Sequence, residues 1–198
     1  MAEITAELVK KLREKTGLGM MQCKEALSAS GGDIEKAVDW LRKKGLDAAN
    51  KRTGRATNQG LIGHYIHVNG KIGVLVEVNC ESDFVARSDD FKELVKNICM
   101  HVAATNPLAV SPDQVPADVV EREKAIYAEQ VKGKPAQITE KIVEGKLKKF
   151  FAERCLLEQP YVKNTDVSVG DLVKEAIAKI GENITVRRFV RYEIGEEL

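Results

Sequence analysis

The sequence has little of several features that would assign it to a specialised class of protein. No apolar run approaches the roughly 18 residues needed to cross a membrane. Aromatic residues make up only 5% of the 198 residues, and they do not alternate with basic ones as on a surface that binds single-stranded nucleic acid. Neither sign of charge is in excess, because 31 Lys and Arg residues oppose 30 Asp and Glu residues. A basic field over the whole chain is therefore excluded, although a local basic patch is not.

Cysteine and targeting signals are also sparse. The four cysteines, at positions 23, 80, 99 and 155, form no CxxC pair, so the spacing of a zinc ribbon is absent. The first seven residues have neither the basic start nor the apolar stretch of a secretory signal. We therefore expect a cytoplasmic protein with reduced, mostly buried thiols and no membrane contact.

The common sequence motifs of enzymes are missing. The chain contains no GxxxxGK[ST], GxGxxG, GxSxG or HExxH. His64 and His67 are three residues apart on an expected strand, so they point to opposite faces and cannot share a metal ion. No nucleophile, base and orienting group can be assembled from the pattern. We expect no catalytic residues, no metal site and no cofactor.

Residues 1–46 are predicted to form a small bundle of three helices. Thr5 is a good N-cap for the first helix, Met20 begins the second, and Asp33 caps the third. The third helix has apolar residues at i, i+3, i+4 and i+7, and Gly45 is expected to end it. Residues 47–59 are interpreted as a linker, which leads into a second domain over residues 60–198.

The second domain is predicted to begin with a β-hairpin. Asn69-Gly70 separates two β-rich runs, and this dipeptide favours a two-residue type I′ turn. Such a turn sets the register, which pairs Tyr65 with Val74 and Leu61 with Val78. The apolar residues then share one face, and that face should be buried.

The rest of the chain alternates helical segments with short strands. Helices are expected from Ser88, over 117–131 and 135–154, and from Ser168 to Gly181. An edge strand is expected within 156–162, and a last strand over 184–194. On that last strand Arg187 and Arg191 should share a solvated face. The fold class is therefore α+β, with an antiparallel sheet covered by helices.

Two short segments are not explained by core packing alone. Met20 and Met21 are adjacent at the start of a helix, so both cannot point into one small core. Either one of them is a core residue, or the pair forms an adaptable apolar contact with a partner. Asp83-Phe84 lies in a short connection between a strand and a helix. Phe84 either closes the end of the sheet or contacts a partner, and the residues alone slightly favour the first.

Four segments together resemble the bacterial elongation factor Ts family. Thr16-Gly-Leu-Gly-Met-Met-Gln-Cys-Lys-Glu-Ala-Leu27 and Glu77-Val-Asn-Cys-Glu-Ser-Asp-Phe-Val-Ala-Arg87 are similar to its two signatures. Glu158-Gln-Pro-Tyr-Val-Lys163 and Gly181-Glu-Asn-Ile-Thr-Val-Arg-Arg188 are similar to its C-terminal part. The segments keep the family's order and span nearly the whole chain, which makes the resemblance specific.

The resemblance implies a guanine-nucleotide exchange factor that acts on the GTPase elongation factor Tu. In the family, an Asp-Phe pair after a hairpin strand enters the GTPase near its nucleotide and magnesium site. The motif is carried here by Ser82, Asp83, Phe84 and Val85. Such a factor makes and breaks no covalent bond, so it is not an enzyme in the chemical sense. The alternative is an RNA-binding or ribosome-associated adaptor module without exchange activity, whereas an exchange factor needs no direct contact with nucleic acid.

The family also indicates how the rest of the chain is used. Its N-terminal module is ubiquitin-associated-like and touches the nucleotide domain of the GTPase through the start of its second helix. The residues at those positions are Met20, Met21 and Lys24. The segments after residue 155 would contact another domain of the partner.

Two departures from the family pattern affect these expectations. Ser82 stands where the family usually has Thr, which keeps the hydroxyl and its local hydrogen bonds. The chain is also short, whereas long members carry a second, copy-like subdomain and a protruding coiled coil. It resembles the short members, which pair as homodimers, so residues 60–198 would also form a dimerisation domain.

Overall fold

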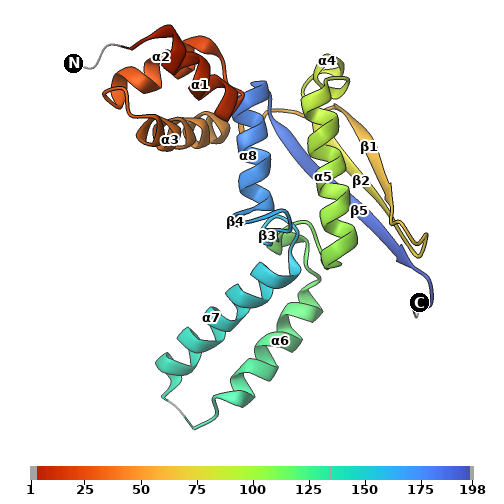
Figure 1. Cartoon of the computed structure of the whole chain (residues 1–198). Coiled ribbons are helices and arrows are strands. Elements are labelled where there is room, and N and C mark those ends of the chain that lie inside the picture. The colour runs from red at the N-terminus through yellow and green to blue at the C-terminus, as the bar shows by residue number, and fades with distance from the viewer. Residues whose placement is uncertain (1–3, 134, 197–198) are drawn as a thin grey trace.

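The computed structural model describes residues 4–133 and 135–196, and it is an α+β fold (Figure 1). Three helices at the N-terminus pack beside α8, while α8 and α5 lie side by side on one face of a three-stranded antiparallel sheet. The helices are α1 (Ala6–Thr16), α2 (Met20–Ala29), α3 (Ile34–Arg52), α4 (Asp83–Ala86), α5 (Asp89–Thr105), α6 (Ala117–Gln130), α7 (Ala136–Arg154) and α8 (Val169–Ile180). The strands are β1 (Gln59–Ile66), β2 (Ile72–Cys80), β3 (Pro160–Tyr161), β4 (Asn164–Ser168) and β5 (Ile184–Glu193), and Pro112–Gln114 forms a 3-10 turn.

The N-terminal bundle forms through the predicted caps and has its own small core. The Thr5 hydroxyl accepts a hydrogen bond from the Leu8 backbone, and the Asp33 carboxylate accepts two from the first turn of α3. The core of the bundle consists of buried apolar residues from all three helices: Val9, Leu12, Cys23, Ala26, Leu27, Ala37 and Leu41.

The predicted end of α3 at Gly45 is wrong, because the helix continues to Arg52. A Cβ atom at Gly45 would lie 3.1 Å from the Ala178 Cβ, so the glycine allows α3 to approach α8 closely. Ala49, one turn further on, is buried in the main core. Tertiary packing therefore overrides the helix-ending tendency of glycine, and the first six residues of the predicted linker 47–59 are helical. The division into domains stays a prediction.

The hairpin has the predicted register but not the predicted turn. Tyr65 pairs with Val74 and Leu61 pairs with Val78. Gly70 has a positive φ of 68°, but Asn69 does not, so the type I′ turn is wrong. The Gly70 N–H instead donates to the His67 carbonyl, which closes a β-turn over residues 67–70, one residue earlier than predicted and within a longer loop.

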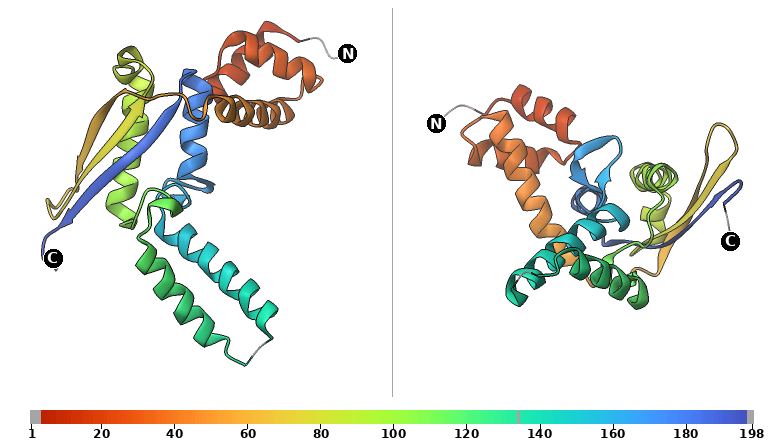
Figure 2. Two further views of the ribbon diagram at one scale, coloured as in Figure 1. Left: turned by 180° about the vertical axis from the view of Figure 1, so that it is seen from behind. Right: turned by 90° about the horizontal axis from the view of Figure 1, so that it is seen from below.

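Helix α5 covers one face of the sheet, whose strand order is β1-β2-β5. It approaches so closely that a Cβ atom at Gly63 would lie 2.2 Å from Val95 Cγ1. The main core lies between this face, α5 and α8, and includes Val74, Val76, Val78, Phe91, Ile98 and Val173. No helix of the described residues covers the opposite face of the sheet (Figures 1 and 2).

Strand β5 contains a bulge that the sequence pattern did not reveal. Glu77 pairs with Arg188 whereas Val78 pairs with Val186, so one extra residue is inserted. Before the bulge the even-numbered residues of β5, such as Val186, face the core, and beyond it the odd-numbered residues do. The Arg191 side chain therefore lies on the core side and is only 8% exposed. Its Nε donates to the Ala103 carbonyl in the last turn of α5. The prediction that Arg187 and Arg191 share a solvated face is therefore wrong.

Helices α6 and α7 form an antiparallel hairpin that protrudes from the end of the molecule opposite α4 (Figures 1 and 2). Both helices were predicted within a few residues. A protruding helical pair is thus present, although the resemblance to short family members implied that it would be missing. The expected strand within 156–162 shortens to Pro160–Tyr161, and its partner β4 was not predicted.

Candidate partner-binding surface

Helix α4 turns Phe84 outward at the end of β2. Its single turn places Val85 and Ala86 toward the core, where Val85 is 7% exposed. Phe84 lies on the other side of the turn and is 81% exposed. Asp83 is also largely exposed, and its carboxylate pairs with Arg87 at 2.8 Å. The interpretation of Phe84 as a plug for the end of the sheet is therefore wrong.

Ser82 is the N-cap of this helical turn. Its Oγ accepts a hydrogen bond from the Val85 N–H at 3.3 Å and donates to the Glu182 carboxylate at 2.6 Å. Sequence reasoning did not single out Glu182, although it belongs to one of the segments that carry the family resemblance. Of the four motif residues, only Asp83 and Phe84 thus present free side-chain surface.

The start of α2 presents a second exposed apolar group. Met20 is 61% exposed and Met21 is 77% exposed, while Lys24 is also exposed. Cys23 points the other way into the core of the bundle. Neither methionine is therefore a core residue, which excludes one of the two readings of the pair. Figure 1 shows α2 and α4 toward the same end of the molecule.

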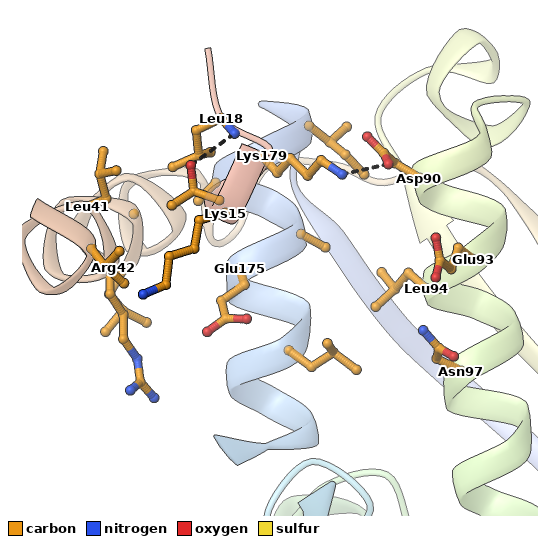
Figure 3. Close-up of a pocket in the computed structure, with 18 residues that line it drawn as sticks. Lys15, Leu18, Leu41, Arg42, Asp90, Glu93, Leu94, Asn97, Glu175 and Lys179 are labelled. Carbon is orange, nitrogen blue, oxygen red and sulfur yellow. Dashed lines mark hydrogen bonds and ion pairs between the residues drawn. The ribbon is translucent and has the colours of Figure 1, made fainter. Parts of the chain in front are cut away.

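A groove of about 410 Å³ separates the bundle from α5 and α8 (Figure 3). Apolar side chains line it, including Leu18, Leu41 and Leu94. Lys179 of α8 pairs with Asp90 of α5 at 2.6 Å across its edge. The groove therefore marks the seam at which the bundle rests on the second part of the chain.

Glu175 also lies in this groove. Burial raises the pKa of its carboxyl group, while the nearby positive charge of Arg42 opposes that rise. Figure 3 shows Glu175 projecting from α8 toward the side of the groove where Arg42 extends from α3.

Among the described residues we find no cluster of metal ligands. No three His, Cys, Asp or Glu side chains in residues 4–133 and 135–196 lie close enough to hold a metal ion. All four cysteines are free and buried, as expected for structural thiols. Burial raises the pKa of the Cys99 thiol to about 11 and that of Cys155 to about 11, so both stay protonated near neutral pH. No helix in this part of the chain meets the length and hydropathy needed to cross a membrane.

The open face of the sheet also carries exposed apolar side chains. Ile62, Ile66, Leu75 and Tyr192 are exposed on it. Glu77 lies among them and binds the guanidinium groups of Arg187 and Arg188 at 2.9 and 2.7 Å. Their hydrogen bonds lower the pKa of the Glu77 carboxyl.

Residues 2–196 match the family model of elongation factor TS. The chain belongs to the elongation factor Ts family. An elongation factor Ts of Desulfosudis oleivorans is 60% identical over 198 residues, covering 99% of this chain and 100% of that protein. One from Fervidobacterium nodosum is 60% identical over 98% of this chain and 100% of its own length. One from Citrifermentans bemidjiense is 57% identical over 98% of this chain and 91% of its own length. The similarity to these factors of translation elongation covers at least 91% of each relative's own length.

Proposed function

We propose that the protein is a guanine-nucleotide exchange factor for elongation factor Tu, acting in the bacterial cytoplasm. The observation that supports this most directly is Phe84, a large apolar side chain held 81% exposed on a turn that is anchored to the core. An exposed phenylalanine contributes little to the stability of the free protein, but it contributes strongly to the free energy of binding when a partner buries it.

Asp83 and Phe84 act at the nucleotide and magnesium site of the partner. Nucleotide and metal hold each other there, because the phosphate charge and the cation stabilise one another. Phe84 displaces groups around that site, and the disturbed form then releases GDP. Coupling of this kind is reciprocal: the exchange factor lowers the affinity of the GTPase for nucleotide, and bound nucleotide lowers its affinity for the exchange factor by the same ratio. No bond is made or broken, and no cofactor takes part.

The N-terminal bundle supplies a second contact. Met20 and Met21 give an adaptable apolar surface, and Lys24 adds a positive charge beside it. Helix α2 lies toward the same end of the molecule as α4, which allows one partner to reach both surfaces (Figure 1).

The proposed functional form is a homodimer. The open face of the sheet carries exposed apolar side chains in a contiguous group, and such patches on a sheet mark interfaces. A second copy, placing the same face against it, would bury both groups at once in an isologous contact. The adaptor or RNA-binding alternative has less support, since Arg187 and Arg188 both pair with Glu77.

The test is release of fluorescently labelled GDP from purified elongation factor Tu. Catalytic amounts of the protein should accelerate release, and excess unlabelled GDP should compete with the factor for its partner. A protein that leaves the spontaneous rate unchanged at micromolar concentration is not an exchange factor. Binding to RNA that weakens steeply with salt would instead support the alternative.

A further inference from the structure

Beneath the turn that carries Phe84, two carboxylates accept hydrogen bonds that connect neighbouring chain segments. One segment leaves β2 and the other leads into β5, the next strand in the sheet. Glu182 accepts hydrogen bonds from the Ser82 backbone N–H at 3.0 Å and from the Ser82 Oγ at 2.6 Å. Glu81 accepts one from the Asn183 backbone N–H at 2.6 Å. Each segment therefore supplies a carboxylate that binds a backbone amide of the other.

We call these two contacts, Glu182 with Ser82 and Glu81 with Asn183, the brace. Ser82 connects the brace to α4. Its Oγ donates to Glu182 while it accepts from the Val85 N–H, so the hydroxyl is held from both sides. Helix α4 has only four residues, and so short a helix has no stability of its own. The direction of Phe84, two residues after Ser82, consequently depends on how Ser82 is held as well as on the packing of Val85 and Ala86 beneath the turn.

The brace also reaches the connection to the N-terminal bundle. Asn183 is buried, and its Nδ2 donates to the Arg55 carbonyl at 2.8 Å. The Arg55 guanidinium lies 3.6 Å from the Glu81 carboxylate. Because Arg55 follows α3 closely, one junction fixes both the turn that carries Phe84 and the chain that leads from the bundle.

We propose that Glu182 is a positioning residue for nucleotide exchange, which holds Ser82 so that Phe84 is presented to the partner. This inference rests on the proposed function and adds to it a residue outside the contact surface. The Glu182 carboxylate is half-buried and engaged by two Ser82 donors, so it acts through the turn. A displacement of about 1 Å in a positioned group can cost roughly 100-fold in rate.

Variants of Glu182 test the role in GDP release at saturating factor. Glu182→Ala removes both hydrogen bonds and should lower the maximal rate at least roughly tenfold. Glu182→Gln should stay within about threefold of the wild type, because its amide oxygen can accept from the Ser82 N–H and its NH₂ can donate to Ser82 Oγ. Glu144→Ala is the matched control, since Glu144 is exposed on α7, and should leave the rate unchanged.

Two outcomes overturn the positioning role. An unchanged maximal rate for folded Glu182→Ala would show that the turn does not need the brace. A Gln variant as slow as the Ala variant would show that the charge of Glu182 acts directly. If Glu182→Ala does not fold, Ser82→Ala removes the 2.6 Å bond together with the cap bond from the Val85 N–H, keeps the backbone bond to Glu182, and should also lower the rate in a folded protein. Full activity of that variant counts equally against the proposal.

A second measurement needs no partner and separates this proposal from the exchange function. Amide hydrogen exchange over residues 82–88 should be faster in Glu182→Ala than in the wild type, while exchange in the centre of α5 stays the same. Unchanged protection of residues 82–88 would overturn the brace. A wild-type protein that fails to release GDP would overturn the proposed function, whatever the hydrogen-exchange result.

Discussion

Because Phe84 is exposed, its removal should have little effect on stability but a large effect on nucleotide exchange. Phe84→Ala should change the free energy of unfolding by no more than about 0.5 kcal/mol, because the ring contacts little of its own protein. It should slow stimulated GDP release by roughly tenfold or more, as expected when an aromatic residue at the centre of an interface is removed. Thermal unfolding and labelled-GDP release, measured on one preparation, check both effects.

The control for Phe84 is the other phenylalanine of this region. Phe91 in α5 is fully buried, so Phe91→Ala should cost roughly 3 to 5 kcal/mol of stability. A large loss of stability in Phe84→Ala, together with unchanged exchange by the folded protein, would make Phe84 a core residue in solution.

Asp83 should matter less than Phe84. Its pair with Arg87 is solvent-exposed, and such pairs contribute about 0 to 1 kcal/mol. We expect Asp83→Asn to slow GDP release by less than Phe84→Ala does. Arg87→Gln distinguishes the causes, because it breaks the same pair and leaves the carboxylate in place. Equal defects in the two variants would assign the effect to the ion pair, and a defect in Asp83→Asn alone would assign it to the partner.

At the scale of the element, α2 has an exposed methionine face, which is the proposed partner contact, and a core face. Met20→Ala combined with Met21→Ala should weaken binding to the partner by roughly 1 to 3 kcal/mol and leave helical content unchanged. Leu27→Ala, on the buried face of α2, should instead destabilise the bundle. Titration calorimetry and circular dichroism measure the two effects. Cooperative loss of helical signal in the double methionine variant would contradict the assignment.

The contact between α5 and β3 should make the fold sensitive to acid. His101 is buried, donates from Nε2 to Gln159 Oε1 at 2.9 Å and accepts the Val162 N–H at Nδ1. Burial lowers its pKa below the ordinary value of about 6.5. The unfolded chain therefore binds the proton more readily, and the free energy of unfolding should fall as pH drops below about 6.5.

Denaturant titrations between pH 5 and 8 would measure this slope. In His101→Gln the site carries no titratable group, so the slope near pH 6 should be smaller, even if the variant is less stable throughout. Equal slopes in the two proteins would assign the acid sensitivity to other groups.

The sequence predicted an element correctly where residues close together in the chain determine its ends and its pairing. Caps such as Thr5 and Asp33, and the paired apolar faces of the hairpin, are set by neighbours in sequence. The continuation of α3 past Gly45 depends on Ala178, and the exchange of faces in β5 depends on a bulge opposite Glu77. Such contacts join residues more than 100 positions apart, and periodicity cannot reveal them.

The candidate site was predictable in position but not in direction. The resemblance identified the Asp83-Phe84 turn, yet which side of a one-turn helix faces the core is decided by Val85 and Ala86 packing beneath it. The same limit applies to Glu182, because its contact with Ser82 spans 100 positions in the chain.

At the scale of the whole molecule, four features of the surface lie at two ends and on one side. The Phe84 turn and the start of α2 lie toward one end, the α6–α7 hairpin protrudes from the other, and the open face of the sheet lies to the side (Figure 1). A dimer formed through the sheet would therefore leave the proposed partner contacts of both copies free.

Light scattering at micromolar concentration should give a mass of two chains, each of 21.9 kDa. Ile62→Glu places a charge on the open face, on the edge strand β1, and should shift the protein toward the mass of one chain, because a buried unpaired charge is costly in an interface. Val68→Glu is the matched control, since Val68 is 96% exposed at the tip of the hairpin loop. It should leave the mass unchanged. A wild-type mass of one chain would refute the dimer, and dissociation by both variants alike would place the contact nearer the hairpin tip than the centre of the sheet.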